Sequence, residues 1–260
     1  MPDLSVLTPA ENAKLAAFVS EFYADPYGFV CAMYPWGEPG LLEQDTGPDA
    51  WQREHLEWIG AQVKANAFDG FHPVTPIRSA VSSGHGSGKS VETGWLVDWI
   101  MSTRPHAQGT VTANTFTQLQ TKTWAAIRRW TKLCLTGHWF VVNSDRMYHP
   151  DHPESWFCAL QSSKEENSEA FAGQHAKDST SFYIFDESSA IPDPIFEVAE
   201  GGLTDGEPMM FLFGNPTRNH GKFHRVAFGS ERERWKQIIV DARDSKFTNK
   251  KQIAEWIQDY

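Results

Sequence analysis

Short apolar runs and longer periodic segments alternate along most of the chain. Runs of strand length cover residues 74–81, 110–113, 182–185 and 209–213. Helical spacing of apolar residues predicts helices over residues 9–23, 50–65, 91–103, 117–135 and 250–260. Apolar and polar residues alternate within residues 138–162, in WFVV and SWFCAL on either side of the Asp/His/Pro turn MYHPDHP. This pattern predicts an antiparallel hairpin. This alternation of strands and helices predicts an α/β fold with a mostly parallel central sheet flanked by helices.

Composition narrows the class of protein. The 260 residues are 40% hydrophobic and include 11 Trp and 17 Phe, which is enough apolar area for a sizeable core in a single domain. No run approaches the ~20 apolar residues of a membrane span, and the N-terminus lacks a signal-peptide pattern. The cysteines Cys31, Cys134 and Cys158 are widely spaced and match no zinc pattern, which favours a reducing compartment.

The net charge of −10 is unevenly distributed. Residues 1–57 hold ten acids and two bases, and residues 158–207 hold eleven acids and two bases. Residues 122–132 hold four bases and no acid, and residues 222–251 hold nine bases and four acids. The first basic stretch predicts either a solvated helix face or a DNA contact. The second is the stronger nucleic-acid candidate, although it could instead complement acids of a neighbouring subunit.

The segment 82–90, SSGHGSGKS, is the strongest local signal because it lies between a predicted strand and a predicted helix. Its glycines let backbone N–H groups converge on phosphate oxygens, and the helix N-terminus adds favourable partial charge. Lys89 is expected to reach the β- and γ-phosphates, and the Ser90 hydroxyl to take one Mg²⁺ position. The predicted nucleotide-binding residues of the loop are Ser83, Gly84, His85, Gly86, Ser87, Gly88, Lys89 and Ser90. Ser83 departs from the strict pattern, which has Gly there, and a Gly-rich turn is the alternative.

Two carboxylates follow the apolar run 182–185. Asp186 is expected to hold Mg²⁺, and Glu187 to act as the general base or water-orienting group that makes it the catalytic residue. A solvated strand end is the alternative for this pattern alone. The phosphate loop about a hundred residues upstream favours the catalytic interpretation.

Two weaker signals add to the predicted site. Gly214, Asn215 and Thr217 follow the run 209–213, and Asn215 or Thr217 could sense the γ-phosphate because parallel strand ends meet at one edge. Trp51 and Gln52 open a predicted helix, where the Gln52 amide could pair with the adenine edge while Trp51 packs nearby. A plain turn and a solvated helix start are the respective alternatives.

Histidine-based sites are set aside. His149, His152 and Cys158 fit no common transition-metal spacing and lie in the predicted hairpin turn. His175 either reports on the nucleotide state or has a structural role.

Taken together, these motifs resemble the ATPase (motor) domain of bacteriophage terminase large subunits over roughly residues 48–245. The motifs that carry the likeness are WQ at 51–52, SSGHGSGKS at 82–90, TANTFTQL at 112–119, FAGQHA at 171–176, IFDESSAIPDPIF at 184–196 and FLFGNPTRNHGKFH at 211–224. The resemblance implies an ASCE-type P-loop NTPase that uses ATP and Mg²⁺ to drive double-stranded DNA into procapsids. It also implies that the segment 214–217, with Gly214, Asn215 and Thr217, couples hydrolysis to movement. It also implies a homo-oligomeric ring in the host cytoplasm, with the procapsid portal and the small terminase subunit as partners and no membrane.

The resemblance also sets expectations for what differs. Residues 1–47 are expected to form an N-terminal extension and residues 48–260 the motor domain, ending before a nuclease domain, so that nuclease activity is not expected. Many terminases have Arg where this chain has His85, which carries no fixed charge near neutral pH. The candidates for an arginine finger are Arg78, Arg104, Arg128, Arg129 and Arg218, unless a neighbouring subunit supplies it. A helicase-like or other nucleic-acid-dependent P-loop ATPase is the alternative enzyme, and a nucleotide-binding module without turnover is the non-enzymatic one.

Overall fold

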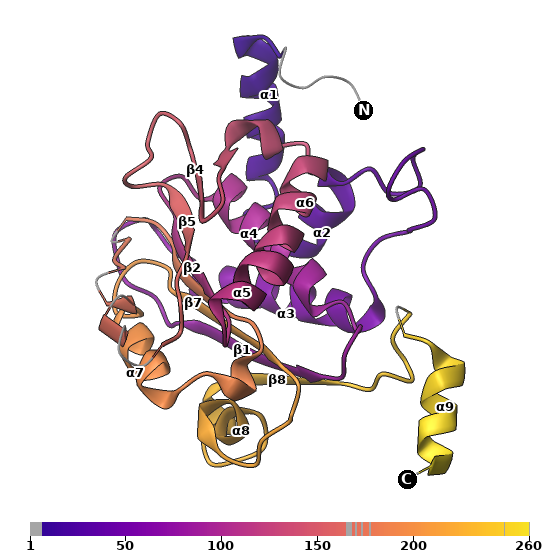
Figure 1. Ribbon diagram of the computed structural model, residues 1–260. Helices are drawn as coiled ribbons and strands as arrows, with labels where there is room; N and C mark the ends of the chain where they lie inside the picture. Colours follow the sequence, from indigo (N-terminus) through magenta and orange to yellow (C-terminus); the bar gives the residue numbers. More distant parts are fainter. Residues whose placement is uncertain are drawn as a thin grey trace.

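A computed structural model describes residues 7–164, 168–169, 171–172, 174–176, 178–246 and 248–259. Expectations for the first six residues, for Gly173 in the segment 171–176 and for the end of the last helix at Tyr260 therefore lie outside the described residues. Within the described part, eight strands form one sheet in the order β3-β4-β5-β2-β6-β7-β1-β8 (Figure 1). The strands are β1 (Ile77–Ser83), β2 (Gln108–Thr112), β3 (Val141–Val142), β4 (Arg146–Tyr148), β5 (Phe157–Leu160), β6 (Ser181–Phe185), β7 (Met209–Gly214) and β8 (Lys236–Val240).

The strand pairings confirm the predicted α/β class. The pairs from β5 through β2, β6, β7 and β1 to β8 are all parallel. Only the β3–β4 and β4–β5 pairs are antiparallel in the described sheet. The predicted hairpin had residues 139–142 pair directly with residues 155–160, and this pairing is wrong, because β4 lies between them and forms the hairpin with β5. The short strand β3 extends this hairpin by a third strand.

Helices cover both faces of the sheet, with α3, α4 and α6 on one face and α7 and α8 on the other (Figure 1). The helices are α1 (Pro9–Ser20), α2 (Pro26–Met33), α3 (Ala50–Asn66), α4 (Lys89–Thr103), α5 (Phe116–Gln118), α6 (Ala125–Leu133), α7 (Asp193–Gly201), α8 (Gly221–Ala227) and α9 (Lys250–Asp259). A π-helix at Leu119–Trp124 separates α5 from α6, where the sequence predicts one continuous helix over 117–135. The helical register therefore changes in the middle of this segment.

Alternating side chains of the buried strands fill two separate cores. Phe182 and Ile184 of β6 belong to the apolar cluster that includes Leu56 of α3 and Leu96 of α4. The intervening Tyr183 and Phe185 of β6 belong to the cluster on the opposite face, which α7 and α8 complete. Because successive side chains of a strand point to opposite faces, a strand that is apolar at every position must be covered on both sides.

Four elements were not predicted from the sequence, namely the helices α2, α7 and α8 and the strand β8. β8 lies in the stretch interpreted as a basic tail, and as an edge strand it buries Ile238 while leaving Ile239 65% exposed. The short helix α2 places Phe29, Val30 and Met33 in the same core as α3 and α4. A domain boundary at residue 48 stays a prediction, but the packing of α2 is continuous with the rest of this core. In the described residues, no helix has the length and apolarity needed to cross a membrane.

Asp98 of α4 makes the stability of this core depend on pH. The side chain is 1% exposed, and it accepts hydrogen bonds from the Tyr34 and Thr131 hydroxyls, both at 2.7 Å. Burial disfavours the charged form and raises the pKa of Asp98 to about 7. Between pH 4 and 7 the folded chain thus holds a proton that the unfolded chain has lost, so stability falls as the pH rises through this window.

We therefore expect the free energy of unfolding to fall by about 1 kcal/mol per pH unit between pH 5 and 7 because of this one group. The Asp98→Asn protein should show a flatter dependence, because an amide does not titrate. Urea unfolding at pH 5, 6, 7 and 8 measures both slopes. Identical slopes for the two proteins would contradict the assignment.

Candidate nucleotide-binding site

The phosphate loop connects the carboxyl end of β1 to the first turn of α4. Gly86 and Gly88 have positive φ angles of 73° and 96°, a backbone conformation that glycine adopts without steric cost. Ser83 ends β1 with a negative φ, so its position does not require the glycine of the strict pattern. Its hydroxyl lies 2.6 Å from the Ser87 hydroxyl and closes the base of the loop. Residues of the loop and of α4 line a cavity of about 380 Å³ together with Lys122, Asp186 and Glu187.

Lys89 is the first residue of α4, and its side chain contacts the start of the loop and is 7% exposed. Its ammonium group donates to the Ser83 hydroxyl at 2.9 Å, to the Gly84 carbonyl at 2.7 Å and to Oδ1 of Asn215 at 2.7 Å. Burial disfavours the charge and lowers the pKa of Lys89, while the nearby charges of Glu187 and Asp186 act in the opposite direction. The lysine therefore has three acceptors for its three protons, one of which lies 126 residues away.

The two predicted carboxylates end β6 beside this loop. Asp186 is 4% exposed, and its Oδ2 accepts a 2.6 Å hydrogen bond from the Thr123 hydroxyl. Its Oδ1 accepts a hydrogen bond from the backbone N–H of Glu187 at 3.0 Å. Burial disfavours the charged carboxylate and raises the pKa of Asp186. Glu187 has φ 51° and ψ 41°, a left-handed conformation that costs a non-glycine residue about 1–2 kcal/mol. Such strain concentrates at functional sites, and here it turns the chain sharply where the Glu187 side chain lines the cavity.

The predicted coupling segment contacts both other parts of the site. The Oδ1 oxygen of Asn215 accepts the hydrogen bond from Lys89. The amide nitrogen of the same side chain lies 2.9 Å from Nε2 of His85. The Thr217 hydroxyl lies 3.0 Å from the Ser189 hydroxyl, two residues beyond Glu187. The strands β6, β7 and β1 are neighbours in the sheet, so their carboxyl ends meet as expected. The segment 214–217 thus connects the phosphate loop to the residues after Glu187.

Trp51 and Gln52 lie behind the phosphate loop and bind its backbone. The Trp51 indole N–H donates to the Ser87 carbonyl at 3.1 Å, and the Gln52 amide donates to the Gly88 carbonyl at 3.1 Å. The Oε1 oxygen of Gln52 accepts a hydrogen bond from the backbone N–H of Asp49 at 2.9 Å. The Gln52 side chain is fully buried. The adenine contact predicted for Gln52 would require both bonds to break. The adenine contact therefore stays a prediction, and in this structure the Gln52 amide bonds the loop, a contact that its spacing at a helix start did not suggest.

No protein-family model matches the chain. Over 193 residues it is 28% identical to the "Probable terminase, large subunit" of Enterobacteria phage P7, an alignment that covers 70% of this chain and 39% of that protein. The chain is similar in sequence to a phage large terminase.

Solved structures agree with the homology at the level of the fold. The large terminase of a thermophilic bacteriophage in complex with ADP superposes with a TM-score of 0.60 at 14% identity, covering 82% of this chain and 50% of that chain. The complex of the same large terminase with ATP-γ-S gives a TM-score of 0.52 at 15% identity, covering 71% and 44%. The chain has the P-loop NTPase fold, with β7 inserted between β1 and β6 as expected for the ASCE type. It spans half or less of the length of these relatives.

Two residues of the cavity were missed from the sequence. Lys122 lines the cavity and Thr123 binds Asp186, and both belong to the π-helix that the sequence predicts as ordinary α-helix. Lys122 was counted there as part of a basic helix face. π-Helical turns inside α-helices often occur at functional sites, but their position leaves no clear trace in apolar spacing.

The five arginines that the sequence predicts as candidates for an arginine finger lie outside this cavity. Arg104 is buried against Glu207 at 2.6 Å, and Arg78 lies over the Trp235 ring. Arg128 and Arg129 line a different cavity on α6, and Arg218 lines one with residues 216–228. Among the described residues, none of the five therefore lines the cavity of the phosphate loop.

The histidine-rich segments have structural contacts. His149 stacks on the Trp156 ring with centroids 4.5 Å apart, and His175 pairs with Asp205 at 3.2 Å. Across the described part of the chain, no group of three or more His, Cys, Asp or Glu side chains could hold a metal ion.

Proposed function

We propose that this chain is the ATP-hydrolysing motor domain of a DNA-packaging terminase, which drives double-stranded DNA into procapsids. The observation that carries the proposal is the bond between Lys89 and Asn215, because it joins the phosphate loop to the coupling segment beside Asp186 and Glu187. The complexes of the thermophilic phage's large terminase with ADP and ATP-γ-S support nucleotide binding by the same fold. A homo-oligomeric ring in the host cytoplasm, a portal and a small terminase subunit belong to the same proposal.

In this proposal, residues Ser83–Ser90 bind the phosphates through backbone N–H groups and the Lys89 ammonium. Lys89 has no spare proton, so contact with the γ-phosphate requires it to release one of its three present acceptors. Asn215 is the acceptor on a separate strand end and is the one that we expect to be released. Glu187 orients the attacking water and accepts its proton.

The residues at the cavity also suit Mg²⁺. Asp186 is a buried carboxylate whose present partners are only a hydroxyl and an N–H group, and Ser90 lines the same cavity. Mg²⁺ prefers oxygen ligands and is held in nucleotide sites by one or two protein groups together with phosphates and water. Ser90 and Asp186 would hold the ion, which would neutralise charge on the β- and γ-phosphates.

Release of Asn215 provides a physical route from the nucleotide to the rest of the molecule. Without Lys89 as donor, the Asn215 carbonyl oxygen must find another partner in a site where the side chain is 4% exposed. Any displacement of Asn215 moves Thr217, which contacts Ser189 next to the catalytic carboxylate. In this proposal, the segment 214–217 takes a second arrangement when Lys89 binds the γ-phosphate, and the nucleotide selects between the two.

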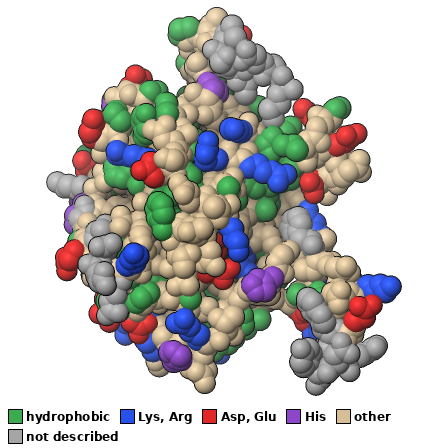
Figure 2. Space-filling model, viewed as in Figure 1, with side chains coloured by type: hydrophobic (Ala, Val, Ile, Leu, Met, Phe, Trp, Pro, Cys, Tyr) green, Lys and Arg blue, Asp and Glu red, His purple; other side chains and the backbone are tan. Residues whose placement is uncertain are grey.

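The structure changes which basic stretch is the better DNA candidate. In the stretch 222–251, four of the nine bases are each paired with a carboxylate of the same chain, namely Lys222, Arg225, Lys236 and Arg243. By contrast, the side chains of Arg128, Arg129 and Lys132 make no hydrogen bond or ion pair with any described residue and are exposed. Lys and Arg side chains gather over the part of the surface where α6 lies (Figure 2). We therefore propose α6 as the DNA-facing surface.

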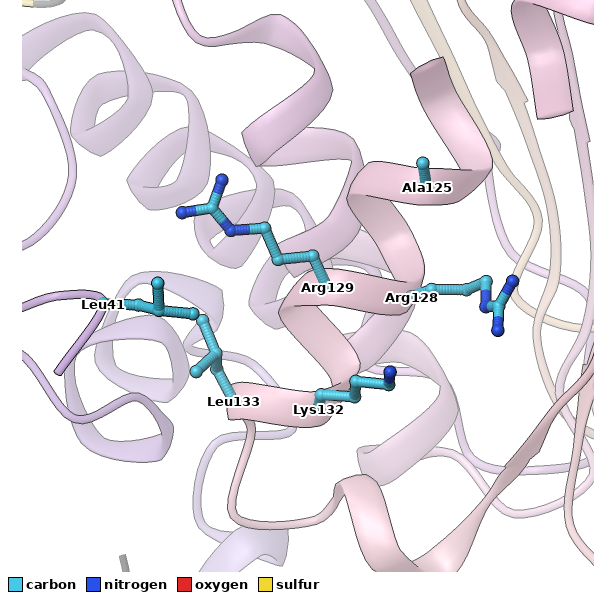
Figure 3. Close-up of a pocket in the computed structure, with 6 residues that line it drawn as sticks. All are labelled: Leu41, Ala125, Arg128, Arg129, Lys132 and Leu133. Carbon is cyan, nitrogen blue, oxygen red and sulfur yellow. The ribbon is translucent and has the colours of Figure 1, made fainter. Parts of the chain in front are cut away.

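A shallow cavity of about 320 Å³ lies along this helix, with Leu41 and Leu133 meeting on one side (Figure 3). Arg128 and Lys132 extend from one side of α6, and Arg129 extends over the other. Three cations on two sides of one helix can follow a charged backbone without reading bases. Because α6 continues the π-helix that binds Asp186, DNA on this surface is mechanically connected to the nucleotide site.

The test is ATP hydrolysis with and without duplex DNA, on the unaltered chain and on the triple variant Arg128→Gln/Arg129→Gln/Lys132→Gln. We expect duplex to stimulate the unaltered chain without strand separation. The triple variant should keep its DNA-independent rate, lose the stimulation and lower the salt dependence of DNA binding by about 2 to 3 in log–log slope. Arg243→Gln, which removes a paired base, is the matched control. Unwinding of the duplex would favour the helicase-like alternative, and full stimulation of the triple variant would exclude α6.

A further inference from the structure

Lys122 lines the same cavity as the phosphate loop and the carboxylate of Glu187. Resting on the ATPase function proposed above, we propose that Lys122 contacts the γ-phosphoryl group and supplies, from the same chain, the positive charge that stabilises it during hydrolysis. Lys122 is then a catalytic residue that the apolar spacing of its helix concealed.

The charge of Lys122 is available to a ligand. Its side chain is exposed and makes no hydrogen bond or ion pair with the residues that the structure describes. Apart from Lys89, it is the only Lys or Arg among the described residues that line this cavity. Lys89 has its protons engaged by the loop and Asn215, so Lys122 is the cation without a competing partner.

The backbone of Lys122 is held in place by its neighbours. Thr123 binds the Asp186 carboxylate at 2.6 Å, and the buried Trp124 donates its indole N–H to the Asn143 carbonyl at 2.9 Å. Leu119, at the other end of the π-helix, is fully buried. Lys122 thus has a flexible side chain on a fixed backbone and is adjacent to Thr123, which donates to Asp186. Its side chain is therefore suited to reach the terminal phosphate.

The chemistry of the site requires such a charge. In hydrolysis, the bond from the attacking water oxygen to the γ-phosphorus forms, and the bond from that phosphorus to the bridging oxygen breaks. The electron pair of the broken bond goes to the β-phosphate of ADP, and the water proton goes to Glu187. Negative charge is spread over the γ-phosphoryl oxygens meanwhile, and a fixed cation beside them lowers the barrier. Lys122 stays protonated throughout.

No other described residue of this chain fits that position. His85 lies at the loop position where many terminases have Arg, but its ring lies 2.9 Å from the Asn215 amide nitrogen, which requires an acceptor nitrogen and hence a neutral ring for a hydrogen bond. The five candidate arginines lie outside the cavity lining. A cation from a neighbouring subunit would add to Lys122, not replace it.

The experiment compares Lys122→Gln and Lys122→Arg with the unaltered chain. It measures the ATP turnover number, the affinity for ADP, and the affinity for ADP with aluminium fluoride, which mimics the transferring phosphoryl group. We expect Lys122→Gln to lower turnover about a hundredfold and to weaken the aluminium fluoride complex by a similar factor, while ADP affinity changes less than twofold. Lys122→Arg should restore part of both losses. Lys64→Gln, which removes an exposed lysine of α3, is the matched control and should change nothing.

Three outcomes would overturn the proposal. Unchanged turnover and unchanged aluminium fluoride binding in Lys122→Gln would exclude a catalytic role. An equal loss of ADP affinity would show that Lys122 only binds the nucleotide. If the unaltered chain itself neither binds ADP nor hydrolyses ATP, the function proposed above fails, and the role of Lys122 fails with it. Thermal unfolding of each variant verifies that the fold is retained.

Discussion

Glu187→Gln is expected to lower ATP turnover about a thousandfold while ATP binding remains close to that of the unaltered chain. Glutamine has the same size as glutamate, so the strained left-handed backbone at this position and the shape of the cavity are retained. The amide cannot accept the proton of the attacking water, so the chemical step fails although the phosphates are still bound. Turnover is measured by phosphate release, and binding by titration with a fluorescent ATP analogue.

Glu197→Gln is the matched control, because Glu197 is an exposed carboxylate on α7 outside the cavity lining. It should hydrolyse ATP at the normal rate. Normal turnover by Glu187→Gln would remove this residue from the catalytic role and return attention to Asp186, the other carboxylate that lines the cavity.

Lys89→Ala is expected to weaken ATP and ADP binding at least a hundredfold, because it removes the one buried ammonium group of the phosphate loop. It also leaves the Ser83 hydroxyl, the Gly84 carbonyl and the Asn215 carbonyl without their present donor. Unpartnered buried acceptors cost about 1–3 kcal/mol each, so this variant should unfold at a lower temperature as well. Titration calorimetry with ADP measures the affinity, and a thermal melt measures the stability.

A second substitution separates these two effects. Lys89→Arg retains a positive charge and several N–H donors but cannot reproduce the compact ammonium geometry. It should recover stability more than affinity. Lys64→Ala serves as the exposed lysine control and should alter neither quantity. Affinity within threefold of the unaltered chain for Lys89→Ala would exclude the loop as the phosphate site.

Local features of the site could be predicted because their chemistry is contained in a few consecutive residues. The glycines of 82–90 with Lys89, and the apolar run that ends in Asp186 and Glu187, specify a loop and a strand end without reference to the rest of the chain. β8 was missed for the opposite reason. As an edge strand it exposes Ile239, so its five residues lack the continuous apolar pattern that marks the central strands.

The sequence by itself determined the α/β class, the position of the phosphate loop and the two carboxylates, since apolar period and motif spacing are properties of contiguous residues. Only the tertiary structure decided how distant groups are used. It paired Lys89 with Asn215, placed the Gln52 amide against the loop, paired four bases of the stretch 222–251 with carboxylates and brought Lys122 to the cavity. Each of these depends on hydrogen bonds or burial between segments far apart in the chain, and side-chain spacing along one segment carries no information about its partner in another.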